Sequence, residues 1–154
     1  MRTILIVLLC INLQNCKNQK TLPENIMAYE LVEKITGDEA RAMVNQLHLQ
    51  PVTNTTNEIG VYEREDKKAT IYITHYKSAE LAEIDLAKMV KKISPKNSVF
   101  INGGDINIKG VKAFRYFGMG QTHYVFNFQN MLIWLSIDTM RAEDFLKEYI
   151  NYLE

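Results

Sequence analysis

The sequence predicts a single α+β domain, in which a mostly antiparallel sheet of about six strands carries amphipathic helices packed on one face. Several short segments alternate apolar and polar residues, as strands do. These segments follow one another through tight turns, which join antiparallel neighbours. Other segments repeat apolar residues at helical spacing. The length of 154 residues is that of one domain.

The beginning of the domain contains one predicted helix. Residues 27–35 fit a strand and a helical turn equally well. Thr36 and Glu39 form a capping box, which starts a helix that ends near His48. A polar loop is expected after this helix.

A hairpin and the most strongly patterned helix come next. Residues 59–64 and 69–76 are rich in β-formers and flank the charged turn 65–68. Ser78 then caps a helix over 79–93. Its acidic residues lie early and its lysines late, which suits the helix dipole. The expected buried stripe of this helix consists of Ala82, Leu86, Met89, Val90 and Ile93.

The second half is a run of strands and a final helix that Asp138-Thr139 opens. Asn102-Gly103-Gly104 predicts a hairpin turn between the first two of these strands. From Ala69 onward the order β-α-β-β-β-β-α resembles the TATA-binding-protein-like arrangement, a resemblance of element order that implies no function. The strands are expected over 99–101, 105–108, 112–117, 122–128 and 131–137.

The first fifteen residues have the layout of a secretory signal peptide. Arg2 gives a positive start, an apolar run covers 4–11, and polar residues follow. A helix of this run spans roughly 12 Å, far less than the ~30 Å of a bilayer core, so the run is too short to cross a membrane. The alternative is that 4–11 form a buried strand of the domain.

Leu13-Gln14-Asn15-Cys16, followed by hydrophilic residues, resembles the lipobox of bacterial lipoproteins. In that family a Leu lies three residues before an invariant Cys that receives the lipid. Asn15 departs from the pattern, because a small residue is usual there. The resemblance covers roughly the first twenty residues and implies that Cys16 begins the mature chain, carrying thioether-linked diacylglycerol. More than one acyl chain makes membrane attachment stable.

The resemblance implies an exported protein, lipid-anchored to a membrane of the bacterial cell envelope. Residues 1–15 are then the signal peptide, 16–26 the lipidated cysteine and a polar tether, and 27–154 the domain. Cys10 and Cys16 are the two cysteines of the chain, so the processed chain would keep neither a free thiol nor a disulfide. A Cys10–Cys16 disulfide is the alternative.

The charge balance and the motifs argue against several functions. Eighteen Lys and Arg against eighteen Asp and Glu leave no basic excess for nucleic acid. Asn102-Gly103-Gly104-Asp105 lacks the Lys-Ser/Thr and the helix of a phosphate loop. No serine lies in a G-x-S-x-G elbow. The sequence carries no positive sign of an enzyme, and no cofactor is expected.

The three histidines are the candidate metal ligands or catalytic groups. His48, His75 and His123 form no pair at i, i+3 or i, i+4, so tertiary folding would have to assemble any metal site. His75 and His123 lie in similar Thr-His-Tyr segments. If their strands are neighbours, a polar patch lines a small cleft. Its expected members are His75, Tyr76, Arg115, His123 and Tyr124.

Three functions follow from these observations. The favoured one is a lipid-anchored envelope module that binds a partner protein or small ligand, because an anchor is visible and catalysis is not. Its contact surface would be the sheet face or the turn 118–120, where Met119 is expected as an exposed apolar tip. The alternatives are a metal or haem site using the three histidines, and a hydrolase with a histidine–carboxylate pair.

Overall fold

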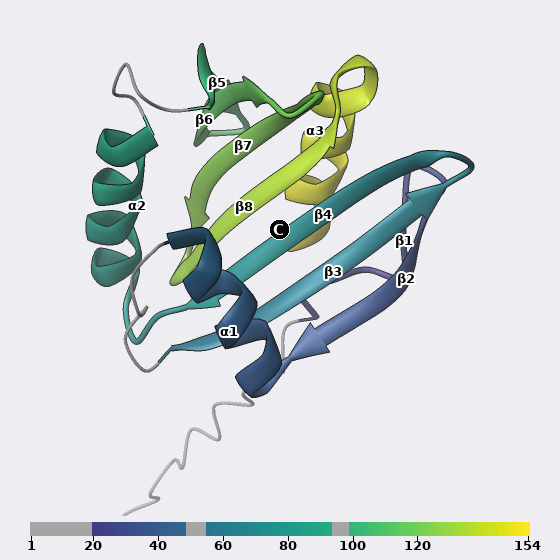
Figure 1. Cartoon of the computed structure of the whole chain (residues 1–154). Coiled ribbons are helices and arrows are strands. Elements are labelled where there is room, and N and C mark those ends of the chain that lie inside the picture. Colours follow the sequence, from purple (N-terminus) through teal and green to yellow (C-terminus); the bar gives the residue numbers. More distant parts are fainter. Residues whose placement is uncertain (1–19, 49–54, 94–98) are drawn as a thin grey trace, which may run out of the picture.

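The computed structural model describes residues 20–48, 55–93 and 99–154. Within these ranges the chain forms one antiparallel sheet of eight strands, with three α-helices (Figure 1). In chain order the elements are β1 (Asn25–Ile26), β2 (Tyr29–Thr36), α1 (Gly37–His48), β3 (Thr56–Arg64), β4 (Lys67–His75), α2 (Ala79–Ile93), β5 (Ile101–Ile108), β6 (Val111–Gly118), β7 (Gln121–Phe128), β8 (Met131–Asp138), the 3₁₀ turn η1 (Thr139–Arg141) and α3 (Ala142–Leu153).

The sheet has the strand order β1-β2-β3-β4-β8-β7-β6-β5. Its two halves meet where β4 pairs with β8, with Tyr72 opposite Trp134. The predicted α+β class is confirmed, but the described residues form eight strands where about six were expected. Part of the difference lies in residues 27–35, most of which belong to β2. None of the helices in the described ranges has the length and apolar character needed to span a membrane.

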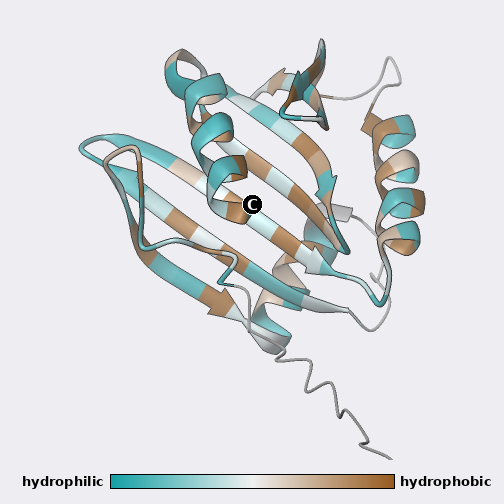
Figure 2. Cartoon of the chain, turned by 180° about the vertical axis from the view of Figure 1, so that it is seen from behind, coloured by the Kyte–Doolittle hydropathy of each residue, from teal (hydrophilic) through white to brown (hydrophobic). Residues whose placement is uncertain are grey.

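The helices cover both faces of the sheet, so the prediction that they pack on one face is wrong. Along β8, Ile133 and Leu135 belong to the cluster packed on α3, whereas Leu132 and Trp134 pack with α2. Successive residues of a strand point to opposite faces, so burial of successive residues in β8 means that both faces of this strand are covered. Figure 1 shows α1 and α2 on the near side of the sheet, and Figure 2 shows α3 across the opposite side.

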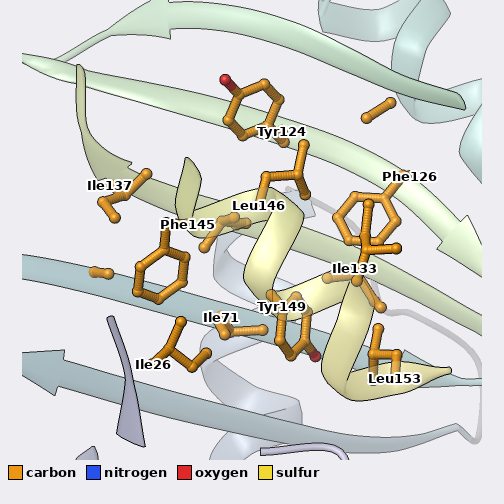
Figure 3. Packing of buried hydrophobic residues seen from close by; sticks show 14 of the residues in the cluster. Ile26, Ile71, Tyr124, Phe126, Ile133, Ile137, Phe145, Leu146, Tyr149 and Leu153 are labelled. Carbon is orange, nitrogen blue, oxygen red and sulfur yellow. The ribbon is translucent and has the colours of Figure 1, made fainter. Parts of the chain in front are cut away.

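The larger core lies between the sheet and α3 (Figure 3). Phe145 and Tyr149, one helical turn apart, are both fully buried. The Phe145 ring lies edge-on to that of Tyr29 at a centroid distance of 5.3 Å. Burying a side chain of this size contributes about 1.5–3 kcal/mol. This core fixes α3, and with it the groups that α3 presents at its two ends.

Residues 21–26, expected to be part of a polar tether, belong to the folded domain. Thr21 is 4 % exposed, and its carbonyl accepts a hydrogen bond of 3.0 Å from the Tyr149 hydroxyl. The Tyr62 hydroxyl donates to the carbonyl of Pro23, also at 3.0 Å. These buried bonds satisfy backbone groups that would otherwise need water, so the chain is held in place at Thr21 and Pro23.

Residues 101–108 form one strand, β5, and not two strands joined by a hairpin turn. The register shifts between Asn102 and Gly104, which is a β-bulge. Gly104 has a φ of +81°, and a Cβ added at Gly103 would lie 2.6 Å from the Phe117 ring. The two glycines therefore permit a bulge within a continuing strand.

Candidate functional site

A polar pocket lies where β6 and β7 meet the beginning of α3. Its volume is about 430 Å³, within the usual range of roughly 300–1,000 Å³ for small-ligand sites. We name it the Arg115 pocket. Its charged and hydrogen-bonding lining includes Arg115, Thr122, Tyr124, Glu143, Asp144 and Lys147.

The bulge of β5 holds Arg115 in place. Both Nε and Nη2 of its guanidinium donate to the carbonyl oxygen of Gly103, at 2.9 and 2.6 Å. The guanidinium carbon lies 5.6 Å from the centroid of the Phe117 ring, in cation–π contact. A guanidinium has five N–H donors, so these bonds leave others for a ligand. The bulge formed by the two glycines therefore positions the cation of the pocket.

Tyr124 lies directly opposite Arg115 across the β6–β7 pair. Figure 3 shows its ring beside Leu146, with the hydroxyl turned away from the labelled apolar side chains. Burial raises the pKa of Tyr124, while the charge of Arg115 and a hydrogen bond to it lower that pKa in part. The phenol therefore stays protonated at neutral pH and lines the pocket as a neutral hydrogen-bonding group.

The first turns of α3 bring charges of both signs to the pocket. Glu143 and Lys147 form an ion pair of 2.9 Å one helical turn apart. The hydrogen bond between them lowers the pKa of Glu143 and raises that of Lys147. Both side chains are half exposed, so the pair contributes little to stability and can exchange partners. Within the described ranges Asp144 makes no ion pair shorter than 4 Å.

A second pocket of about 380 Å³ adjoins the first one. Glu143 and Lys147 line both pockets, so their ion pair stands between the two. The second pocket adds the amides of Asn107 and Asn151 and the side chain of Lys109.

Two of the five residues expected in one polar patch lie in the Arg115 pocket, namely Arg115 and Tyr124. The strands of the two histidines are not neighbours, because β8 lies between β4 and β7. His75 pairs with Met131 of β8, and His123 pairs with Ser136. These β8 positions are five residues apart, so the two histidines lie on opposite faces.

The fifth residue of the expected patch, Tyr76, is in a third place. It packs with Leu86 and Met89 in the core under α2, and burial raises its pKa. The patch of His75, Tyr76, Arg115, His123 and Tyr124 is therefore not assembled as one site.

His75 forms a histidine–carboxylate pair with Glu58 on β3. Its Nε2 lies 2.8 Å from Oε1 of Glu58, and Lys34 Nζ lies 2.9 Å from Oε2. The Thr21 hydroxyl donates to Oε1 at 3.2 Å. The hydrogen bond with His75 outweighs burial and lowers the pKa of Glu58 to about 2. Neither described pocket includes these residues, and the cluster joins the N-terminal segment to the sheet.

His123 is buried among groups that satisfy both of its ring nitrogens. A carbonyl can only accept, so Nε2 carries the proton that is donated to Gly118 at 3.0 Å. Nδ1 therefore accepts, from the Ser136 hydroxyl at 2.8 Å and from Trp134 Nε1 at 3.1 Å. Burial lowers the pKa of His123, which keeps the ring neutral. Sequence reasoning missed Ser136 as its partner, because cross-strand pairing is set by the register.

His48 is the last residue of α1, and its side chain lies outside the described residues. Among the residues that are described, no group of three or more His, Cys, Asp or Glu side chains is placed to hold a metal ion. The expected signal peptide over 1–15 and the lipidation site at Cys16 also lie outside the described residues.

Met119 is 74 % exposed at the turn between β6 and β7. Met140, on η1 at the rim of the Arg115 pocket, is 90 % exposed. Gln121, two residues after Met119, pairs with Asp138, two residues before Met140. Both methionines therefore lie at the end of the sheet that carries the pocket.

Comparison with protein-family models, with curated proteins and with solved structures finds no match for this chain.

Proposed function

We propose that the protein is a lipid-anchored module of the bacterial cell envelope, which binds in its Arg115 pocket a small ligand that carries both charges. The observation behind the binding proposal is the guanidinium of Arg115, fixed by Gly103 and sharing one pocket with Lys147, Glu143 and Asp144. The anchor proposal is supported by the sequence: the signal-like segment 1–15 and the lipobox-like residues before Cys16.

The pocket is lined by side chains of both charges, which favours a zwitterionic ligand. A ligand carboxylate can take the remaining donors of Arg115 and the ammonium of Lys147. A ligand ammonium can then meet Glu143 or Asp144, whose carboxylates line the same pocket. A ligand with one charge would face a like charge nearby, which opposes its binding. An amino acid or a short peptide with free ends has the required chemistry.

Calorimetric titration of the mature protein in detergent tests the ligand class. The probe is the dipeptide Ala-Ala with free ends, compared with the same dipeptide acetylated and amidated. We expect the free dipeptide to bind and Arg115→Gln to weaken its binding about tenfold, since a charge-assisted bidentate contact is lost. Lys91→Gln, which removes an exposed cation of α2 on the other face, is the matched control and should leave the Kd unchanged. Equal binding of the blocked dipeptide would refute the proposal.

Substitution of Cys16 tests the anchor. In a bacterial host, Cys16→Ala should abolish incorporation of labelled lipid and move the protein out of the membrane fraction, because acyl chains provide the attachment. Cys10→Ala alters the other cysteine, inside the apolar run, and should preserve both properties. Unchanged labelling and membrane retention of Cys16→Ala would contradict the proposal.

A further inference from the structure

We infer that the anchor holds the Thr21 end of the domain against the lipid surface and presents the Arg115 pocket on the side away from the membrane. This inference rests on the proposed lipid anchor at Cys16. It adds an orientation, which the anchor alone does not imply.

The chain enters the fold at a fixed point. Thr21 is nearly fully buried, and two groups from different elements hold it. Its carbonyl accepts from the Tyr149 hydroxyl of α3 at 3.0 Å, and its hydroxyl donates to Glu58 of β3 at 3.2 Å. Pulling the entry point off the sheet would break both bonds and expose the buried Leu22.

The segment between the anchor and this point is short. Four residues, 17–20, separate Cys16 from Thr21. Five Cα–Cα steps reach about 18 Å when fully extended. A folded chain of this size is roughly 35 Å across, from a radius of gyration of about 14 Å. This reach is about half of that width, so the end that bears Thr21 stays nearer the lipid than the far end of the domain does. Lys17 and Lys20 of this segment add attraction to anionic headgroups.

The pocket lies toward the other end of α3. Tyr149 reaches Thr21 from the second half of the helix. Burial, and after it the charge of Glu24, raises the pKa of Tyr152 near the end of the helix. Glu143, in the first turn, lines the pocket. Tyr152 lies nine positions after Glu143 on the helix, a rise of about 14 Å. The exposed Met140 precedes the helix on η1 and lines the same pocket as Glu143.

Single cysteines can measure this orientation, because the sulfur of Cys16 is a thioether in the lipidated chain and Cys10 leaves with the signal peptide, so no native thiol competes for the label. Tyr152→Cys and Met140→Cys replace exposed residues near the two ends of α3. Each lipidated variant is labelled with a nitrobenzoxadiazole fluorophore. It is then added to phosphatidylethanolamine–phosphatidylglycerol vesicles whose headgroups carry a nitroxide quencher. We expect at least about threefold stronger quenching at position 152, since nitroxide quenching falls steeply over distances as large as the helix rise.

Two controls keep the outcomes distinct. Lys20→Cys reports the same end should Tyr152→Cys fail to fold, and it should also be strongly quenched. Insertion of twenty Gly and Ser residues between Gln19 and Lys20 should remove the difference between the two ends, because a long flexible linker frees the domain. Equal or stronger quenching at position 140, in protein whose intact mass includes the lipid on Cys16, would overturn the orientation alone. A mass without lipid would overturn the proposed function and this inference together.

Discussion

At the residue scale, Glu58 gathers partners from three separate parts of the chain: Thr21, Lys34 and His75. Its pKa falls from the ordinary 4.5 to about 2, chiefly through the hydrogen bond with His75. A lowered carboxyl pKa contributes stability that is present above pH 4.5 and is lost as the pH falls toward 2. Glu58 therefore stabilises the attachment of the N-terminal segment throughout the neutral range.

We predict that Glu58→Gln lowers the free energy of unfolding at pH 7 by about 1–2 kcal/mol, less than the pKa shift alone implies because solvent screens part of the interaction. The loss should shrink when the urea melt is repeated at pH 3. Glu63→Gln, on the same strand but in an exposed pair with Lys68, should change stability by less than ~0.5 kcal/mol. Equal losses for Glu58→Gln at pH 7 and pH 3 would show that its ionisation is not responsible.

His123 should make the stability of the protein sensitive to acid in a different pH range from that of Glu58. Its pKa is lowered by burial, so the unfolded chain takes up a proton near pH 6.5 before the folded chain does. Stability is then complete above pH 6.5 and falls as the pH drops below it. We predict a smaller decrease between pH 7.5 and 5.5 for His123→Gln than for the native chain, as measured by urea unfolding. Identical decreases would indicate that His123 does not titrate in this way.

The sequence indicated some of these residues but not how they are grouped. Arg115 and Tyr124 were selected as polar residues on strands, and they do lie together. His75 and His123 were grouped with them because their local sequences are alike. Local alternation does not reveal that β8 lies between their strands. Similar segments therefore ended on opposite faces of the sheet.

At the element scale, α2 shows that local sequence signals can be enough to predict the boundaries of a helix. The helix runs over Ala79–Ile93 as predicted, and the Ser78 hydroxyl accepts from the Leu81 N–H at 3.3 Å, as a cap does. Short-range bonds determine such boundaries. The bulge of β5 depends instead on contacts with β6, and the glycines that predicted a turn equally permit a bulge.

The buried stripe of α2 gives a prediction about packing. Leu86 is 7 % exposed against the core under the helix, so Leu86→Ala should cost about 2–5 kcal/mol. Leu81→Ala on the same helix is the matched control, because Leu81 is 45 % exposed. Its cost should stay within ~0.5 kcal/mol. Similar urea midpoints for the two variants would mean that α2 does not pack as described.

The two-sided cover of the sheet had a signal in β8. Met131-Leu132-Ile133-Trp134-Leu135 is continuously apolar, as in strands buried on both faces. The expectation of helices on one face rested on the element order, in which tight turns join antiparallel strands and amphipathic helices cover the resulting sheet. The continuous apolar run of β8, which joins the two halves of the sheet, therefore indicates that both faces are covered.

At the scale of the whole molecule, α3 connects the two features on which the proposal depends. Its first turn lines the Arg115 pocket, and Tyr149 holds the chain at Thr21. The same helix packs over the larger core. Because the same helix contacts both, the place where the chain enters the domain and the pocket keep a fixed spacing along α3.

The measurement that tests the central claim most directly is the intact mass, with N-terminal peptide mapping, of protein taken from the membrane fraction of a bacterial host. We predict a mature chain that begins at Cys16 and carries diacylglycerol. An unprocessed chain beginning at Met1 in the soluble fraction would contradict it. Residues 4–11 would then belong to the fold, and the envelope role would have to be abandoned.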